Sequence, residues 1–102
     1  MKGLTILGST GSIGISTLDV VARHPDEYKV VALTANRDVE GMLRQCAQFH
    51  PEIAVMADQQ SANQLAKGLN DQGLTTEVLS GLRGLEIAAS MPQASWVMAA
   101  IV

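Results

Sequence analysis

A glycine-rich segment near the N-terminus has the composition and spacing of a phosphate-binding loop. Residues 8–14 read GSTGSIG, so Gly8, Gly11 and Gly14 recur at every third position. The segment follows the apolar run 4–7 and precedes a helix-like pattern. In dinucleotide-binding folds such glycines permit a tight turn, a close approach of backbone to pyrophosphate, and close packing of helix on strand. The segment therefore predicts a phosphate site at a helix N-terminus.

An alternative interpretation of this loop is a glycine-rich turn that only connects two elements. Its spacing is G-x-x-G-x-x-G, whereas many NAD enzymes have G-x-G-x-x-G. Thr10 and Ser12 add hydroxyl groups that can reach phosphate oxygens, and Ser12 is also a candidate N-cap of the following helix. The placement of the glycines between a strand and a helix favours phosphate binding.

The type of dinucleotide is usually set about 20 residues beyond such a loop. The chain there reads Ala35-Asn36-Arg37-Asp38. Arg37 favours NADPH over NADH, because a planar guanidinium can pair with a 2′-phosphate. Asp38 would repel a phosphate, and its alternative role is to cap the next helix, where its charge suits the helix dipole. We favour the capping role.

Strand-like and helix-like patterns alternate along the chain. We predict strands at residues 2–7, 28–34, 52–56, 76–79 and 95–102, and helices at 12–24, 39–49, 61–69 and 82–89. Alternation with short connections predicts an α/β fold, namely a doubly wound parallel sheet of the Rossmann-like NAD(P)-binding type with helices on both faces. The first strand would be central, with the glycine loop at its carboxyl end, where strand order reverses.

Two further patterns concern burial. The first helix has an apolar stripe at helical spacing, formed by Ile13, Thr17, Val20 and Val21, which we expect to face the core. The last apolar run, SWVMAAIV, ends at Val102 with no helix to cover it. Because a strand buried on both faces needs neighbours, we infer that residues 1–102 are a fragment, one domain whose sheet is incomplete at its C-terminal end.

Composition excludes several classes of function. The 102 residues suit one domain, and 47% hydrophobic residues with only 3% aromatic suit a helix-covered parallel sheet. The net charge of −3 and the scattered basic residues argue against binding of nucleic acid. With one cysteine, Cys46, no internal disulfide can form, and neither a signal peptide nor a membrane span is recognisable. We therefore expect a cytoplasmic protein.

The residues that most often carry catalysis do not form a recognisable group here. His24 and His50 each precede a proline at the end of a predicted helix, where a histidine has a structural use. No pair of carboxylates, nucleophile with a base, or metal-ligand cluster can be assembled from the sequence. We therefore assign no catalytic and no metal-binding residue to this chain.

Several segments taken together resemble one enzyme family. These are LTILGSTGSIGISTLDVV, VVALTANRDV, EVLSG and VMAAIV. They are similar to the N-terminal part of 1-deoxy-D-xylulose 5-phosphate reductoisomerases, and the resemblance spans all 102 residues. The glycine loop alone is shared with several NADP-dependent dehydrogenases, whereas its combination with STLDVV and VMAAIV is specific.

The resemblance implies an NADPH-binding domain of an oxidoreductase. The whole enzyme would rearrange and reduce 1-deoxy-D-xylulose 5-phosphate, a sugar phosphate, to 2-C-methyl-D-erythritol 4-phosphate in non-mevalonate isoprenoid biosynthesis. It would use NADPH and a divalent metal, Mg²⁺ or Mn²⁺, and would be a homodimer. In this family the metal ligands and substrate-binding groups lie beyond the position of Val102, so the resemblance implies that residues 1–102 alone are not catalytic.

The resemblance also assigns cofactor contacts. By position these are Gly8, Thr10, Gly11, Ser12 and Ile13 at the pyrophosphate, Asn36, Arg37 and Asp38 at the adenosine ribose and 2′-phosphate, and Ala100 and Ile101 close to the cofactor at the end of their strand. One triplet departs from the family, which usually has glycine, a basic or small polar residue, and asparagine at positions 36–38.

Two other functions remain open from sequence. One is a different NADP-dependent dehydrogenase with the same glycine spacing, similar to aspartate-semialdehyde dehydrogenase. The other is a non-catalytic module that senses nucleotides.

Overall fold

The computed structural model describes residues 1–100, which form five strands and four helices in strict alternation. In chain order these are β1 (Lys2–Leu7), α1 (Ser12–Ala22), β2 (Tyr28–Thr34), α2 (Val39–Phe49), β3 (Ile53–Met56), α3 (Gln59–Asp71), β4 (Glu77–Ser80), α4 (Gly81–Ala89) and β5 (Trp96–Ala99). The strands form one sheet in the order β4-β3-β2-β1-β5, and every neighbouring pair is parallel. The predicted α/β fold with a parallel sheet is confirmed.

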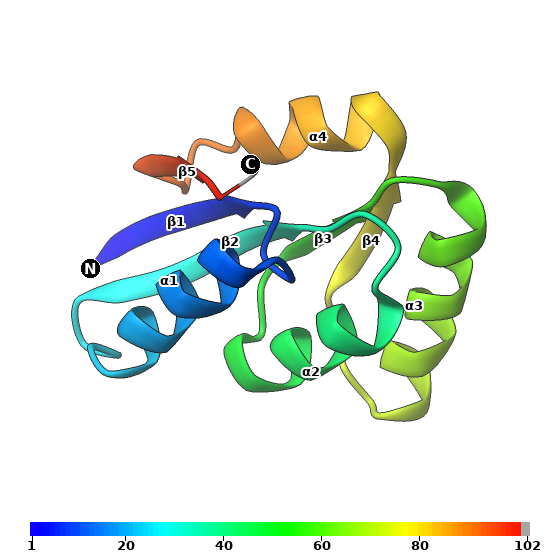
Figure 1. Ribbon diagram of the computed structural model, residues 1–102, viewed down its shortest axis with the longest axis horizontal. Helices are drawn as coiled ribbons and strands as arrows, with labels where there is room; N and C mark the ends of the chain where they lie inside the picture. The colour runs from blue at the N-terminus through cyan, green and yellow to red at the C-terminus, as the bar shows by residue number, and fades with distance from the viewer. Residues whose placement is uncertain (101–102) are drawn as a thin grey trace.

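The sheet changes direction once. Strands β1 to β4 follow one another toward one edge of the sheet, and β5 then pairs with the other side of β1. Crossovers of one hand put helices on opposite faces when the direction reverses. Accordingly α4 lies on one face of the sheet, and α1, α2 and α3 lie on the other (Figure 1). The carboxyl ends of β1 and β5 are thus the switch point, where α/β sheets bind ligands.

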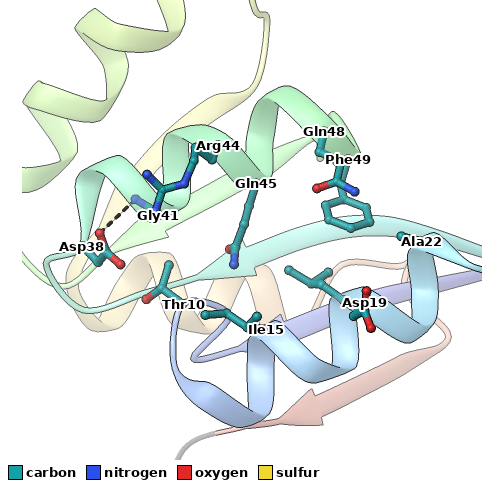
Figure 2. Close-up of a pocket in the computed structure, with 11 residues that line it drawn as sticks. Thr10, Ile15, Asp19, Ala22, Asp38, Gly41, Arg44, Gln45, Gln48 and Phe49 are labelled. Atoms are coloured by element: carbon teal, nitrogen blue, oxygen red, sulfur yellow. Dashed lines mark hydrogen bonds between the residues drawn. The ribbon is translucent and has the colours of Figure 1, made fainter.

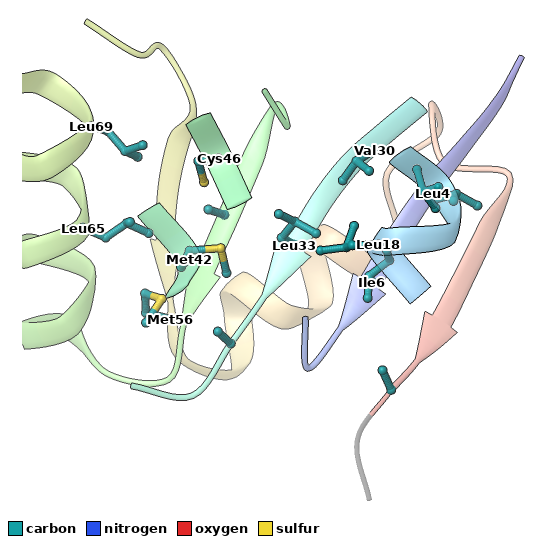
Figure 3. Close-up of a cluster of buried hydrophobic side chains, with 14 of the residues drawn as sticks. Leu4, Ile6, Leu18, Val30, Leu33, Met42, Cys46, Met56, Leu65 and Leu69 are labelled. Carbon is teal, nitrogen blue, oxygen red and sulfur yellow. The ribbon is translucent and has the colours of Figure 1, made fainter. Parts of the chain in front are cut away.

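Each face of the sheet has its own hydrophobic core. The larger core lies under α1, α2 and α3 (Figure 3) and contains Leu4, Ile6, Leu18, Val21, Val30, Leu33, Ala35, Met42, Cys46, Ala54, Met56, Ala62, Leu65, Leu69 and Ala100. The smaller core lies under α4 and contains Ala32, Ile53, Val55 and Ala88. Beside it the buried hydroxyl of Thr5 donates a hydrogen bond to the Ala88 carbonyl at 3.1 Å, which ties α4 to β1.

The burial of α1 differs from the prediction. Its buried residues are Gly14, Leu18 and Val21, whereas Ile13 and Val20 are both 51% exposed. The buried face is therefore rotated relative to the predicted stripe, with only Val21 common to both. Gly14 must face the loop backbone of Gly8 and Ser9, where a Cβ atom has no room, and its neighbours on that face of the helix are Leu18 and Val21.

Two helices differ from the prediction by two residues at their boundaries, and one of those boundaries is set by a side-chain cap. Helix α1 ends at Ala22, two residues before the predicted end, and α3 extends beyond the predicted 61–69 at both ends. The start of α3 is set by Asp58, whose side chain accepts a hydrogen bond from the backbone N–H of Ser61 at 2.8 Å. A cap of this kind fixes the first helical residue, which apolar spacing does not report.

Strand β5 is an edge of the sheet in the described part of the chain. Trp96, Val97 and Met98 are 50%, 46% and 36% exposed, and the ammonium of Lys2 lies 4.6 Å from the centre of the Trp96 ring. Within residues 1–100, none of the helices has both the length and the apolar character needed to cross a bilayer.

The core predicts a contrast between two leucines that both lie in helices. Leu65 is fully buried and Leu82 is 79% exposed. We expect Leu65→Ala to lower the free energy of unfolding by about 2–5 kcal/mol, because it leaves a cavity. The matched Leu82→Ala should change it by less than about 0.5 kcal/mol. Urea unfolding followed by circular dichroism measures both, and equal losses would contradict the assignment of the core.

Candidate functional site

Gly8 forms the turn that follows β1. Its φ is 79°, a left-handed conformation that side chains rarely adopt. The backbone N–H groups of Gly8 and Ser9 donate to the Thr34 carbonyl at 3.0 and 2.8 Å, and the Thr34 hydroxyl also accepts from Gly8 at 3.1 Å. The loop is thereby anchored to the end of β2, which gives Gly8 the predicted role in a tight turn.

Gly14 lets α1 pack directly on the loop. A Cβ atom at this position would lie 2.6 Å from Cα of Ser9 and would overlap the carbonyl oxygen of Gly8. Both neighbours are backbone, so neither can rotate away as a side chain could. Gly14 therefore has the predicted role in close packing of the helix, and it fixes which face of α1 is buried.

Gly11 is not required by the fold. Its φ of −78° and ψ of 172° are open to any residue, and an added Cβ would make only an ordinary 3.6 Å contact with the Gly8 carbonyl oxygen. Gly11 is the N-cap of α1, and no side chain caps this end of the helix. The prediction that Ser12 is the N-cap is wrong, since Ser12 is the first helical residue. The first N–H groups of α1 consequently have no side-chain acceptor.

A cleft of about 630 Å³ opens beside the glycine loop. It is lined by Gly8, Thr10, Gly11, Ser12, Thr34, Ala35, Asn36, Asp38, Met56, Ala57, Leu85 and Ala100. Seven of the residues predicted from sequence therefore share one cavity at the switch point. The other five were not predicted as site residues, although four of them lie at or just beyond the ends of β2 and β3 and so follow from the rule that parallel strands end at the same edge of a sheet. The five are Thr34, Ala35, Met56, Ala57 and Leu85.

Two of the predicted residues that the structure describes are not on the wall of this cleft. Ile13 is half exposed on α1, and Arg37 extends from the β2–α2 loop toward Asp58, with 3.4 Å between its Nε and the carboxylate Oδ2. Ile101 lies outside the described residues.

A second cavity, of about 320 Å³, lies between α1 and α2 (Figure 2). Thr10 and Asp38 line both this groove and the cleft. At its base the side-chain amide of Gln45 donates to the Ser9 carbonyl at 2.8 Å. Helix α2 thereby holds the glycine loop at Ser9.

Asp38 caps α2 as expected. Its Oδ1 accepts a hydrogen bond from the N–H of Gly41 at 2.9 Å (Figure 2). A Cβ on Gly41 would lie 2.8 Å from the carboxyl carbon of Asp38, so glycine leaves room for the cap. Asp58 plays the equivalent role at α3, where hydrogen bonds from Ser61 lower the pKa of the Asp58 carboxyl group.

The cysteine and the two histidines have structural roles. Burial raises the pKa of the Cys46 thiol to about 11, so the thiol is protonated at neutral pH. His50 is the C-cap of α2 in a left-handed conformation, and His24 packs edge-on against Tyr28. Among residues 1–100 no three His, Cys, Asp or Glu side chains come together in a way that could hold a metal ion.

Comparison with known proteins gives consistent matches. The sequence model of the family described as 1-deoxy-D-xylulose 5-phosphate reductoisomerase matches residues 4–102. The reductoisomerases of Nitrosomonas europaea and Nitrosospira multiformis are 67% and 58% identical to this chain over 99% and 100% of its length. The same alignments cover 24% and 26% of the two relatives, so the chain spans about a quarter of their length.

Solved structures give the same result. A DOX-P reductoisomerase in complex with NADPH, fosmidomycin and magnesium superposes with a TM-score of 0.94 at 40% identity, over 99% of this chain and 24% of that one. The reductoisomerase from Zymomonas mobilis in complex with NADPH superposes with a TM-score of 0.90 at 43% identity, over 98% and 26%.

The different roles of the glycines lead to a prediction. Gly14→Ala should lower the free energy of unfolding by about 1–3 kcal/mol, because the loop backbone must move. Gly11→Ser should change it by no more than a few tenths of a kcal/mol, about the difference between these residues at an N-cap. Thermal unfolding of both variants tests the contrast, and a large loss in Gly11→Ser would show that the fold does need a glycine there.

Proposed function

The chain belongs to the 1-deoxy-D-xylulose 5-phosphate reductoisomerase family, and we propose that residues 1–102 are the NADPH-binding domain of such an enzyme. The whole enzyme would convert 1-deoxy-D-xylulose 5-phosphate to 2-C-methyl-D-erythritol 4-phosphate in non-mevalonate isoprenoid biosynthesis. It would be a cytoplasmic homodimer that uses Mg²⁺ or Mn²⁺, with no nucleic-acid or membrane partner. Its substrate and metal sites would belong to the three quarters of the relatives' length that this chain does not span.

The observation that carries the proposal is the uncapped N-terminus of α1 at Gly11. The fold tolerates a side chain at this position, so the absence of one is explained by a ligand that approaches the backbone. The position borders the cleft at the strand-order reversal. Unpaired N–H groups and the positive end of a helix dipole together favour a phosphate group.

The predicted residues then divide into three roles. Backbone N–H groups of Thr10, Ser12 and Ile13 would hold the pyrophosphate, and for Ile13 only the backbone is required, in keeping with its outward side chain. Gly11, whose own N–H donates to the Gly8 carbonyl at 3.2 Å, would let the phosphate approach the backbone closely. Asn36, Arg37 and Asp38 would line the adenosine ribose and its 2′-phosphate. Gly8, Ala100 and Ile101 would border the cofactor at the ends of β1 and β5.

NADPH, when bound, supplies the hydride for the reduction. The part of the chain that the structure describes would contribute binding and orientation. It offers neither a thiolate, since Cys46 is buried and protonated, nor a group of metal ligands. The dehydrogenase similar to aspartate-semialdehyde dehydrogenase and the nucleotide-sensing module are not supported by any observation that would favour them over the family shown.

Titration of the chain with NADPH tests the proposal. We expect binding in the wild type and a weakening of about tenfold or more in Gly11→Ser, because a side chain would block charge-assisted hydrogen bonds from the backbone. NADH should be weakened equally, since both cofactors have a pyrophosphate. We expect no turnover of 1-deoxy-D-xylulose 5-phosphate by residues 1–102, with or without Mg²⁺. Equal affinity of the wild type and Gly11→Ser would contradict the proposed site.

Selection of NADPH over NADH should depend on Arg37. We expect Arg37→Ala to weaken NADPH by about 1.5–3 kcal/mol, the contribution of a charge-assisted hydrogen bond, with little effect on NADH. Arg23→Ala is a matched control, because Arg23 is also exposed and paired with an aspartate but lies at the C-terminal end of α1, the end opposite to the glycine loop. Competition between the two cofactors measures the ratio of affinities, and equal loss for both would place recognition of the 2′-phosphate on other residues.

A further inference from the structure

Arg37 and Asp58 come from neighbouring loops at the carboxyl edge of the sheet. Arg37 follows β2, and Asp58 follows β3 and caps α3. The Nε of Arg37 lies 3.4 Å from Oδ2 of Asp58, and the Arg37 side chain is 77% exposed. A long side chain at such an exposed position has many rotamers in solution. Contact with a phosphate requires that most of these rotamers be lost, which costs conformational entropy.

The carboxylate of Asp58 is held in place much more firmly. Its Oδ1 accepts the N–H of Ser61 at 2.8 Å, and its backbone carbonyl accepts the N–H of Ala62 at 3.1 Å. The adjacent Ala57 donates its N–H to the carbonyl of Asn36 at 2.9 Å. The loop before α2, which contains Arg37, and the loop before α3, which contains Asp58, are thus joined by a backbone hydrogen bond. The Asp58 carboxylate is therefore a fixed partner for the Arg37 guanidinium.

The contact engages only one part of the guanidinium. Arginine has five N–H donors, one on Nε and four on the two Nη atoms. Because Nε is the atom of Arg37 that lies 3.4 Å from Oδ2 of Asp58 in this ion pair, the Nη groups are left for another acceptor. Since a phosphate is recognised in a bidentate manner by this planar fork, a guanidinium held at Nε retains the donors that such recognition needs.

We propose that Asp58 is a positioning residue, which holds Arg37 by its Nε so that the two Nη groups face the 2′-phosphate of NADPH. The inference rests on the proposed function and extends it to a residue outside the cleft wall. Asp58 thereby increases the preference of the cleft for NADPH over NADH without touching either cofactor.

The negative charge of Asp58 has an opposing effect, because it repels the 2′-phosphate. The phosphate would lie on the far side of the guanidinium, however, and Coulomb energy falls with distance and with screening by solvent at an exposed site. The attraction at 3.4 Å is the closer of the two interactions. We therefore expect the gain from positioning to exceed the screened repulsion.

Asp58→Asn separates this role from helix capping. Asparagine keeps a side-chain oxygen for the N–H of Ser61 and removes the charge that holds Arg37. We expect the dissociation constant for NADPH to rise about two- to fivefold, as for loss of an exposed ion pair, and that for NADH to stay unchanged. Asp19→Asn, which removes the 2.8 Å ion pair to Arg23, is the matched control and should change neither.

A double variant shows whether Asp58 acts through Arg37. In the Arg37→Ala background, Asp58→Asn should add no further loss of NADPH affinity. Tighter NADPH binding in Asp58→Asn, or unchanged binding, would overturn the inference, as would a loss that persists without Arg37 or that affects NADH equally. If the wild-type chain does not bind NADPH, the proposed function fails, and this inference fails with it. If the wild type prefers NADPH but Asp58→Asn leaves the preference intact, only the inference fails.

Discussion

The packing of Gly14 against the backbone of Gly8 and Ser9 is the contact on which the rest of the site depends. No other residue type fits there, since the neighbouring atoms are backbone. The contact sets the rotation of α1, so that Leu18 and Val21 enter the larger core. It also sets the height of the helix above β1, and with it the position of the first N–H groups. The same turn is anchored by hydrogen bonds to Thr34 in β2 and to Gln45 in α2, so three elements share one loop.

The distribution of caps explains why α1, among the helix ends near the cleft, is the one open to an anion. The N-termini of α2 and α3 are occupied by the carboxylates of Asp38 and Asp58, which satisfy N–H groups and offset the positive ends of the dipoles. Helix α1 has no such side chain. Helix α4 also lacks a side-chain cap, but it begins after β4, at the far edge of the sheet, and its N-terminal residues do not line the cleft. The uncompensated partial charge beside the cleft is therefore that of α1.

Sequence patterns predicted the structure correctly where it follows local rules. The strand and helix alternation, the parallel sheet and the placement of the loop at the switch point all follow from hydrophobic period and glycine position. Side-chain capping by Asp38 was also predictable, because an aspartate stood directly before an apolar helical pattern. The prediction was wrong where packing against backbone decides which face is buried, as in the rotation of α1 about Gly14. The ion pair between Arg37 and Asp58 was not predicted, because 20 residues, including α2 and β3, separate the two side chains in the sequence.

The two parts of cofactor recognition depend on different kinds of structure. Donors for the pyrophosphate would be backbone groups, and these are set by Gly14, a fully buried Ser9 and the ends of two strands. Selection of the 2′-phosphate would depend instead on exposed side chains, chiefly Arg37, whose interactions are screened by salt. A substitution at Gly14 changes the packing of the fold, whereas one at the exposed Arg37 leaves it intact. The affinity for dinucleotides would therefore be constrained by the architecture, while the choice between NADPH and NADH would be open to change through a single surface residue such as Arg37.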